Sequence, residues 1–211
     1  MKLTKFGHAC FLVEENGARI LFDPGNFSNL QDEVKNLDLI LITHEHADHC
    51  DPQSIKNILK NNPAVKIFTN SGVGAVLAKE GINYEILEEG GSIVYKNVLV
   101  EAFGDKHAII YSTIPQIQNT GYFINNKLFY PGDNFINPGK AVPVLALPVA
   151  APWLKISETL DYAQAVHPAS WFAAHDGMLK NPEFGSRWPA NLLEPMGIKF
   201  IKLEIGQETE I

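Results

Sequence analysis

The sequence predicts an α/β fold with large, mixed β-sheets. About ten short apolar runs contain β-branched or aromatic residues and end in turn residues, which is typical of strands. At least three further segments carry the apolar spacing of helices. The predicted strands cover residues 10–13, 18–22, 37–42, 65–69, 92–95, 98–103, 121–124, 127–130, 142–147 and 199–203.

The helices are predicted from their start signals and from their apolar spacing. Asp51 is suited to an N-cap and Pro52 to the first helical position, so one helix is expected to begin there. A second helix is expected over residues 73–79 and a third over residues 157–166. The pair Asn125–Asn126 between two apolar runs predicts a tight hairpin, which adds an antiparallel element.

Size and composition limit the class of protein. A chain of 211 residues allows one substantial core, and we expect a single domain over residues 1–211. The share of hydrophobic residues, 45%, and of charged residues, 19%, is that of a globular protein. A formal net charge of −7 disfavours nucleic acid as a partner. Because neither a signal-peptide core nor a membrane-spanning run is present, we expect a cytoplasmic protein without membrane association. The oligomeric state is left open.

Cysteine contributes little to these expectations. Cys10 and Cys50 are the only two cysteines, which is too few for a disulfide framework. Both lie near histidines in the sequence, so they either line a pocket or, as we favour, are small buried residues.

The stretch "ITHEHADHCD", residues 42–51, carries the main functional signal. It follows a predicted buried strand and places three of the seven histidines of the chain in one loop. Loops at the carboxyl ends of strands are favoured positions for ligand sites in α/β proteins. Imidazole and carboxylate side chains that converge there suit zinc, iron or manganese. A helical H-E-x-x-H protease motif is excluded, because Asp48 stands where the second histidine is needed.

The spacing His44-x-His46-x-Asp48-His49 resembles the signature of the metallo-β-lactamase fold superfamily and is complete at all four positions. The resemblance extends over nearly the whole chain. "ARILFDPG" is similar to the strand that ends in a structural aspartate, here Asp23. Three further segments resemble the family's ligand-bearing segments: "LFYPGDN" with Asp133, "GDKHAIIYSTIPQIQNTGYFI" with His107, and "ASWFAAHDG" with His175.

This resemblance implies a four-layer αββα sandwich of two mixed sheets flanked by helices. It also implies two adjacent divalent metal ions, with zinc as the first expectation and manganese or iron as alternatives. The implied ligands are His44, His46 and His107 for one ion, and Asp48, His49 and His175 for the other, with Asp133 between them.

The function that follows is hydrolysis of an ester, lactone or phosphodiester of a small molecule by hydroxide bound to the two metals. Asp133 would bridge the metals, Asp48 would also orient the nucleophile, and Asp23 would hold a histidine ring. His8 in "FGHACFLV" resembles a glycine-histidine pair of the branch that contains the L-ascorbate-6-phosphate lactonase-like proteins and the N-acylphosphatidylethanolamine phospholipases. There the histidine lies near the metals, so His8 is either a third catalytic residue or a turn histidine.

Three alternative functions remain: a nuclease of the same fold, a mononuclear iron dioxygenase, and a catalytically silent scaffold. Among other residues, Trp153 and Lys155 are either pocket residues or a core tryptophan and a solvated lysine. Trp188 either covers the site or packs elsewhere. Asn134 stands where members of the superfamily commonly have threonine, which puts the transfer of a substrate from them in doubt.

Overall fold

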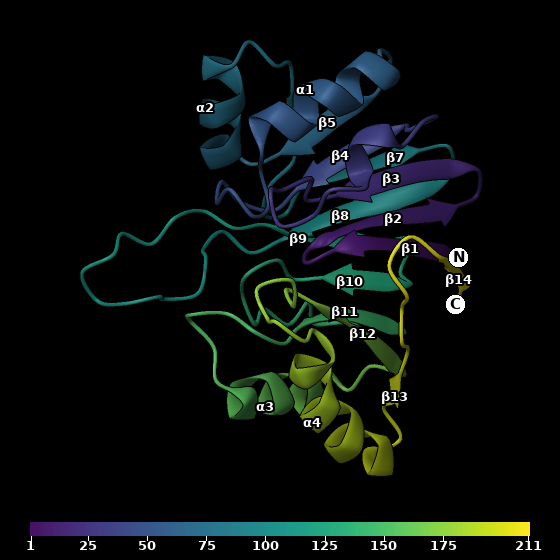
Figure 1. Cartoon of the computed structure of the whole chain (residues 1–211), viewed down its shortest axis with the longest axis vertical. Helices are drawn as coiled ribbons and strands as arrows, with labels where there is room; N and C mark the ends of the chain where they lie inside the picture. Colours follow the sequence, from purple (N-terminus) through teal and green to yellow (C-terminus); the bar gives the residue numbers. More distant parts are fainter.

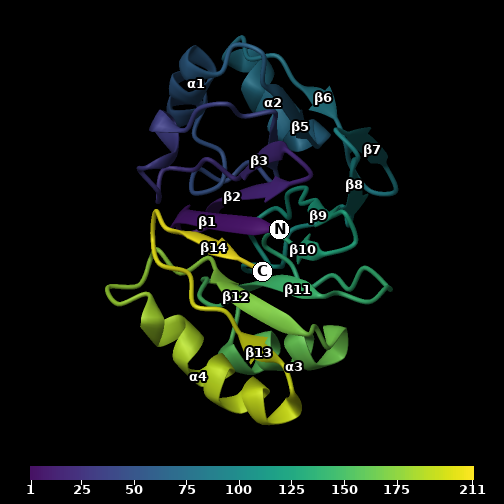
Figure 2. The ribbon, with the colours of Figure 1, turned by 90° about the vertical axis from the view of Figure 1, so that its right-hand side faces the viewer.

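Two seven-stranded β-sheets face each other, and two helices cover the outer face of each, as Figures 1 and 2 show in this computed structural model of residues 1–211. The four layers are those of the predicted αββα sandwich. The first sheet has the order β14 (Glu208–Glu210), β1 (Lys2–Gly7), β2 (Cys10–Glu15), β3 (Ala18–Phe22), β4 (Leu39–Ile42), β5 (Lys66–Thr69) and β6 (Glu85–Ile86). The second has the order β13 (Lys199–Phe200), β12 (Ser170–Ala174), β11 (Val144–Pro148), β10 (Leu128–Tyr130), β9 (Gly121–Ile124), β8 (Val98–Phe103) and β7 (Ser92–Tyr95).

Both sheets combine an antiparallel part with a parallel part. β1, β2 and β3 form an antiparallel meander, and β3 to β6 run parallel to one another. In the second sheet β7 to β10 are antiparallel, and β10 to β13 are parallel. Parallel strands end at a common edge, so the loops after β4, β10 and β12 are brought to one side of the molecule.

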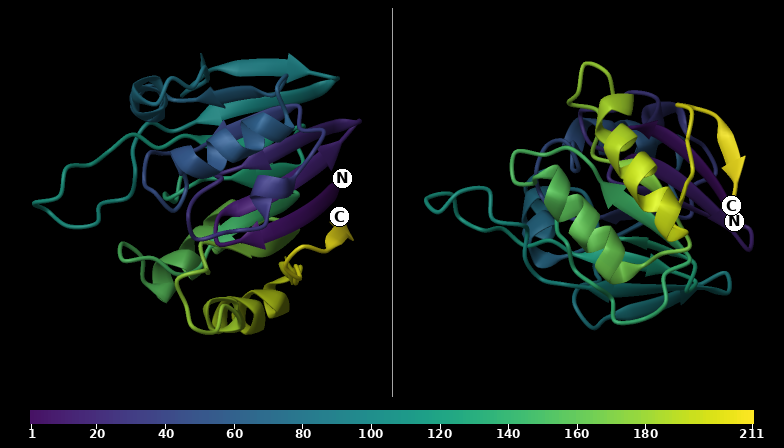
Figure 3. Two further views of the ribbon diagram at one scale, coloured as in Figure 1. Left: turned by 45° about the horizontal axis from the view of Figure 1, so that its top comes forward. Right: turned by 90° about the horizontal axis from the view of Figure 1, so that it is seen from below.

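The helices are α1 (Pro52–Asn61), α2 (Ser71–Lys79), α3 (Ile156–Val166) and α4 (Glu183–Leu193), with single 3₁₀ turns η1 (Gln31–Glu33) and η2 (Glu194–Met196). α1 and α2 pack on the first sheet; α3 and α4 lie side by side on the second (Figure 3). None of these helices has the length and apolar character needed to cross a membrane.

Alternating side chains of the strands supply three apolar cores. In β3, Ile20 and Phe22 face the 22-residue core between the sheets, whereas Leu21 faces the core beneath α1 and α2. A third core lies between the second sheet and α3 and α4. Burial of one large apolar side chain contributes about 1.5–3 kcal/mol, so these cores fix the sheets on which the loops are built.

Several local predictions are confirmed. Asp51 caps α1 by accepting hydrogen bonds from the backbone of the first turn. Asn125 and Asn126 both have positive φ, at 51° and 53°, as the predicted tight hairpin between β9 and β10 requires. The helix expected over residues 73–79 is present and begins two residues earlier, at Ser71.

Other local expectations were wrong in extent. The strand expected over residues 199–203 is only two residues long, and α3 begins at Ile156, one residue before the expected start. α4 was missed because its segment contains Gly185 and Pro189, which disfavour helices. Both residues lie on its buried face, and a Cβ at Gly185 would come within 2.9 Å of Val149. The glycine is therefore needed for close packing.

Candidate metal centre

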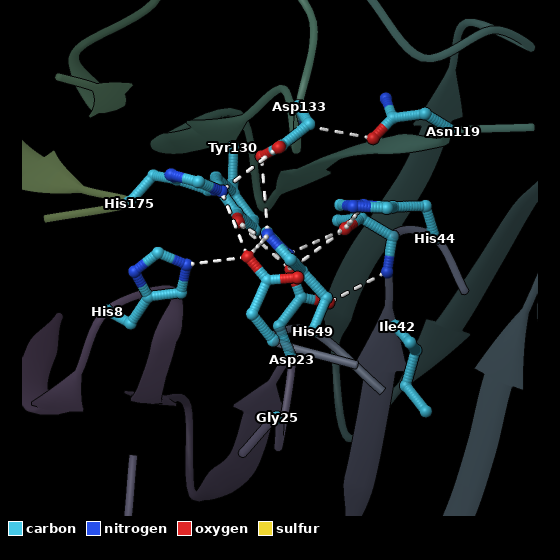
Figure 4. A network of polar contacts seen from close by, with 12 residues as sticks. His8, Asp23, Gly25, Ile42, His44, His49, Asn119, Tyr130, Asp133 and His175 are labelled. Carbon is cyan, nitrogen blue, oxygen red and sulfur yellow. Dashed lines mark hydrogen bonds and ion pairs between the residues drawn. The ribbon is translucent and has the colours of Figure 1, made fainter. Parts of the chain in front are cut away.

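The seven predicted ligands lie together at one edge of the sandwich. Figure 4 shows four of them, His44, His49, Asp133 and His175, with the residues that hold them. Four of them occupy the loop between β4 and α1, and one each follows β8, β10 and β12: His44, His46, Asp48 and His49, then His107, Asp133 and His175. The first sheet thus supplies four of the side chains and the second sheet three. The site forms only where the two sheets meet.

Their donor atoms form three overlapping groups in which every donor lies within 4.8 Å of the others. One group is three histidines, His44, His46 and His107. Another contains Asp48, His49 and His175 together with His8, and a third joins His44 and His49 to Asp133. The first two groups are the two halves of the ligand set implied by the sequence resemblance, and the third links them.

In four buried histidines, Nδ1 forms a hydrogen bond within the protein and Nε2 faces the other ligands. Nδ1 of His49 donates to Asp23 Oδ2 at 2.7 Å, and Nδ1 of His107 and of His175 donates to the carbonyl oxygens of Ala108 and Ala150, at 2.6 and 2.5 Å. Each Nδ1–H is therefore held by the protein, which leaves the lone pair of Nε2 for a metal.

His44 follows the same arrangement through Thr43. The hydroxyl of Thr43 donates to Asp23 at 2.8 Å, so it accepts from Nδ1 of His44 at 3.0 Å. Nε2 of all four of these histidines and Oδ1 of Asp133 are buried without any hydrogen-bond partner. Since unpaired buried polar atoms are costly, five such atoms in one place fit a bound cation.

Asp133 lies between the two groups. Its carboxylate oxygens are 3.0 Å from Nε2 of His175, 3.3 Å from that of His49 and 3.4 Å from that of His107. The indole N–H of Trp153 donates to Oδ2 of Asp133 at 2.7 Å. Trp153 is thus a pocket residue rather than a core residue, and it fixes the orientation of this carboxylate.

Electrostatics in the group agree with a site built for positive charge. Burial would raise the pKa of Asp133, but His49 and His175 outweigh burial and hold that pKa well below its ordinary value. Burial would lower the pKa of His175, but Asp133 and Asp48 instead raise it to about 10. Burial lowers the pKa of His44 well below its ordinary value, which keeps this imidazole neutral.

His8 contacts the centre through Asp48. The backbone N–H of Gly177 donates to Nδ1 of His8 at 3.1 Å, so Nε2 carries the proton and donates to Asp48 Oδ2 at 3.0 Å. Burial lowers the pKa of His8, although its hydrogen bond to Asp48 opposes the change, which agrees with this neutral form. His8 therefore positions Asp48 and leaves no nitrogen for a metal in this arrangement.

Asp23 supports the ligand loop as expected from the sequence. Besides holding His49 and Thr43, it accepts a hydrogen bond from the hydroxyl of Tyr130 at 2.9 Å. Sequence analysis did not identify Thr43 or Tyr130. Each carries a hydroxyl at the end of an apolar strand, and this was the signal available in the sequence. Thr43 directly precedes the predicted ligand His44, and Tyr130 lies three residues before Asp133.

Two close backbone approaches also shape the centre and were not predicted. A Cβ at Gly25 would overlap the carbonyl of Asp48, so only glycine allows the ligand loop to lie there. Asn119 accepts from the N–H of Asp133 at 2.9 Å and donates to the carbonyl of Pro131 at 2.9 Å. The turn that presents Asp133 is held by this amide.

The remaining candidates lie outside the centre. Lys155 is exposed where α3 begins, and Trp188 is 53% exposed on α4; neither lines the opening over the ligands. Cys10 and Cys50 are buried in the core beneath α1 and α2, and burial raises the pKa of the Cys50 thiol to about 12. The amide of Asn134 donates to the carbonyl of Lys106, so Asn134 holds the backbone next to His107.

The fold and the site together define a metal-binding protein of the αββα sandwich class. The model of the β-lactamase superfamily domain matches residues 2–175. Protein Rv0786c of Mycobacterium tuberculosis is 39% identical over 85% of each chain, and the UPF0173 protein PF0020 of Pyrococcus furiosus is 30% identical over 84% of each. The chain belongs to the β-lactamase superfamily domain family and, within it, to the UPF0173 group.

Solved structures agree on the fold. Igni18, a metallo hydrolase from Ignicoccus hospitalis, superposes with a TM-score of 0.76 at 23% identity over 100% of this chain and 98% of its own. The metallo-β-lactamase fold protein YhfI from Bacillus subtilis gives 0.71 at 14% identity over 99% of each chain.

Proposed function

We propose that this protein is a metal-dependent hydrolase that uses two divalent metal ions to cleave an ester, lactone or phosphodiester bond of a small molecule. The observation that carries the proposal is the set of four histidine Nε2 atoms and one Asp133 oxygen, buried together without hydrogen-bond partners. UPF0173 relatives from Methanobrevibacter smithii and Thermoplasma acidophilum, 31% and 33% identical over 63% of this chain, are named metal-dependent hydrolases, which supports the same class.

The ligand assignment follows the donor groups. His44, His46 and His107 would hold one ion, Asp48, His49 and His175 the other, and Asp133 would contact both. Zinc is the first choice of metal, and manganese and iron accept the same ligands. When bound, two such cations supply a water of lowered pKa and polarise the oxygen of the bond under attack.

The protein's own residues supply orientation and proton handling. Asp48 is the more accessible of the two carboxylates, with 19% of its side chain exposed against 3% for Asp133. It is therefore placed to accept a hydrogen bond from an attacking water. His8 holds Asp48 from one side, and Trp153 holds Asp133 from another. Both carboxylates are thus oriented before a substrate enters.

The test is metal content and turnover in one preparation. Protein purified without chelator, and again after reconstitution with zinc, manganese or iron, is analysed by plasma mass spectrometry and assayed with ester, lactone and phosphodiester substrates. We expect about two equivalents of metal and turnover that a chelator abolishes. Asp133→Ala should remove most turnover and leave the fold intact, whereas Asp105→Ala, an exposed control, should change neither.

Each alternative predicts another result of this experiment. About one equivalent of iron, with oxygen consumption, would favour the dioxygenase. No binding after reconstitution would favour the silent scaffold. Strong, salt-dependent binding of RNA would favour the nuclease. Full turnover by Asp133→Ala with both metals bound would contradict the bridging role of Asp133.

A further inference from the structure

We infer that the metal centre acts on an uncharged ester or lactone whose body is apolar, and that it discriminates against substrates with a second, anionic group. This inference rests on the proposed hydrolase function and narrows it. In the reaction, water adds across the acyl C–O bond. Its oxygen bonds to the acyl carbon and one proton passes to the leaving oxygen, which gives an acid and an alcohol.

The first observation is the lining of the opening above the ligands, a cavity of about 300 Å³. Apart from the ligands themselves, its walls are mainly apolar side chains, and neither lysine nor arginine lines it. The non-ligand residues are Asn26, Phe27, Ala47, Ile110, Pro152, Trp153 and Met178. A pocket of this kind binds through apolar contact and a few polar groups, which here are the ligands.

The rim continues this apolar surface. Phe27 and Met178 are 49% and 40% exposed on one side of the opening. On another side the loop between β8 and β9 projects away from the body of the molecule, as Figures 1 and 3 show, and it carries Ile109, Tyr111 and Ile114, which are 67%, 64% and 48% exposed. Large apolar side chains gathered in the open mark binding surfaces.

This loop is anchored at the ligands, so its apolar side chains begin next to the centre. The backbone N–H of Ala108 donates to the carbonyl of Asp133 at 2.8 Å, and the N–H of His107 donates to the carbonyl of Ile117 at 2.9 Å. Ile110, three residues after His107, lines the cavity itself. Ile110 therefore belongs both to the wall of the cavity and to the loop that carries the exposed apolar side chains.

No lysine or arginine lines the cavity above the ligands, so none is placed there to pair with a distal anion. Lys106 and Lys155 are exposed and do not line the cavity. A neighbouring cavity of about 760 Å³ is lined by Lys5, Lys202 and Arg187. Lys5 is paired with Asp176 at 2.5 Å and Lys202 with Glu183 and Glu204, whereas Arg187 is exposed on α4 and does not line the cavity above the ligands. An anionic group buried in the cavity above the ligands would lose water without gaining an ion pair to lysine or arginine, and the net charge of −7 would oppose its approach.

Binding of three hydroxamates to the metal-loaded protein, measured by calorimetry, tests the inference without turnover. Acetohydroxamate supplies the metal-binding head alone, hexanohydroxamate adds an apolar chain, and the monohydroxamate of adipic acid ends a chain of the same length in a carboxylate. Each buried methylene strengthens binding about threefold to fourfold. We expect hexanohydroxamate to bind at least tenfold more tightly than acetohydroxamate, and the adipic compound to lose most of this gain.

Two variants assign the effect to the wall of the cavity. Ile110→Ser should weaken the binding of hexanohydroxamate about tenfold. The affinity for acetohydroxamate and the metal content should stay unchanged. Ile110→Lys should reverse the preference toward the adipic compound. The matched control is Val94→Ser, because Val94 is 70% exposed on β7 and does not line the cavity.

The outcomes separate this inference from the proposed function. The inference would be overturned if acetohydroxamate and hexanohydroxamate bound with equal affinity, or if the unaltered protein bound the adipic compound more tightly than hexanohydroxamate. The hydrolase proposal would still hold in that case, provided that the protein binds two metals and its turnover is sensitive to a chelator. A protein that binds neither metal nor any hydroxamate would overturn both. With p-nitrophenyl esters, the same preference should appear as at least tenfold higher kcat/KM for the hexanoate than for the adipate monoester.

Discussion

At the scale of single residues, His8 connects two parts of the centre that are far apart in the sequence. It accepts from Gly177 and donates to Asp48, and its carbonyl accepts from the N–H of His175 at 3.1 Å. A Cβ at Gly177 would come within 2.8 Å of the Cβ of His8, so glycine is required at this contact. The turn between β1 and β2 is therefore fitted to the backbone around a ligand.

His8→Asn tests this positioning role. Replacement of the imidazole removes one of the groups that orient Asp48, and loss of such outer hydrogen bonds typically lowers activity or metal affinity about 10–100-fold. We expect kcat to fall within this range while KM and far-UV circular dichroism stay nearly unchanged. His167→Asn is the matched control, because His167 also has a positive φ, 50° against 48° for His8, but lies exposed at the end of α3. Equal kcat in both variants would contradict the role.

Asp23→Asn should separate metal affinity from the fold. Asp23 accepts from His49, Thr43 and Tyr130, and its replacement puts an amide N–H against donors. We expect the dissociation constant of the metal to rise about 10–100-fold in a chelator competition assay. Asp105→Asn, which alters an exposed residue, should not change it. An unchanged constant in Asp23→Asn would show that the ring of His49 is held by other groups.

At the scale of elements, local signals predicted those parts of the fold where pattern and environment agree. β3, β7, β8 and β9 were predicted to the residue because each combines apolar alternation or a buried run with clear turns. α4 was missed because its helix forms against α3 and the second sheet in spite of Gly185 and Pro189. Tertiary packing overrides propensity there, and a single sequence does not reveal that packing.

Three strands of the first sheet, β1, β6 and β14, were missed for a related reason. β6 is two residues long, β14 is three, and β1 carries Lys2 and Lys5 in a short strand. Their pairing partners, rather than their own residues, decide that they are strands. β14 pairs with β1 through Lys2 and Glu210, which are 208 positions apart in the chain.

Glu15 ties β2 to the hairpin between β9 and β10 and gives the molecule an acid-sensitive contact. It accepts from Asn125 and Lys127, both at 2.7 Å. Burial would raise the pKa of Glu15, but these two hydrogen bonds lower it below its ordinary value of 4.5. A depressed folded-state pKa means that the stabilisation is present above pH 4.5 and is lost as the pH falls through the lowered value.

Glu15→Gln should therefore lower the free energy of unfolding by about 1–3 kcal/mol at pH 7. The difference from the unaltered protein should shrink as the pH falls below the pKa of Glu15. Urea unfolding at pH 7 and at several acidic pH values measures both effects. The control is Glu85→Gln, because the pair of Glu85 with Lys66 is more than half exposed and should contribute under 1 kcal/mol. A difference that does not depend on pH would rule out the titration of Glu15 as its source.

At the scale of the whole molecule, the ligand set could be predicted and its supports could not. The seven ligands carry a spacing that survives in the sequence, with four of them within six residues. Thr43, Tyr130 and Asn119 carry no such spacing, because each is defined by a neighbour that only the packing of two sheets brings near. From the sequence, Trp153 could be either a pocket residue or a core residue, and its hydrogen bond to Asp133 identifies it as a pocket residue.

Because the ligands come from both sheets, bound metal should act as a link between them. The core between the sheets contains 22 buried residues, so the metal-free protein should remain folded. A ligand at 100 times its dissociation constant stabilises the native state by about 2.7 kcal/mol. For a chain of this size that corresponds to a rise in Tm of roughly 5–10 °C.

The measurement is differential scanning calorimetry of chelator-treated protein before and after addition of zinc, manganese or iron. His167→Asn should show the same rise as the unaltered protein. Asp133→Ala should lose most of it, since the carboxylate of Asp133 lies within 3.4 Å of histidines from both groups of donors. Far-UV circular dichroism should be the same with and without metal. A Tm that none of the three metals changes would mean that the sheets are held by their apolar core alone and that the cluster of histidines and carboxylates does not bind these ions when the protein is folded.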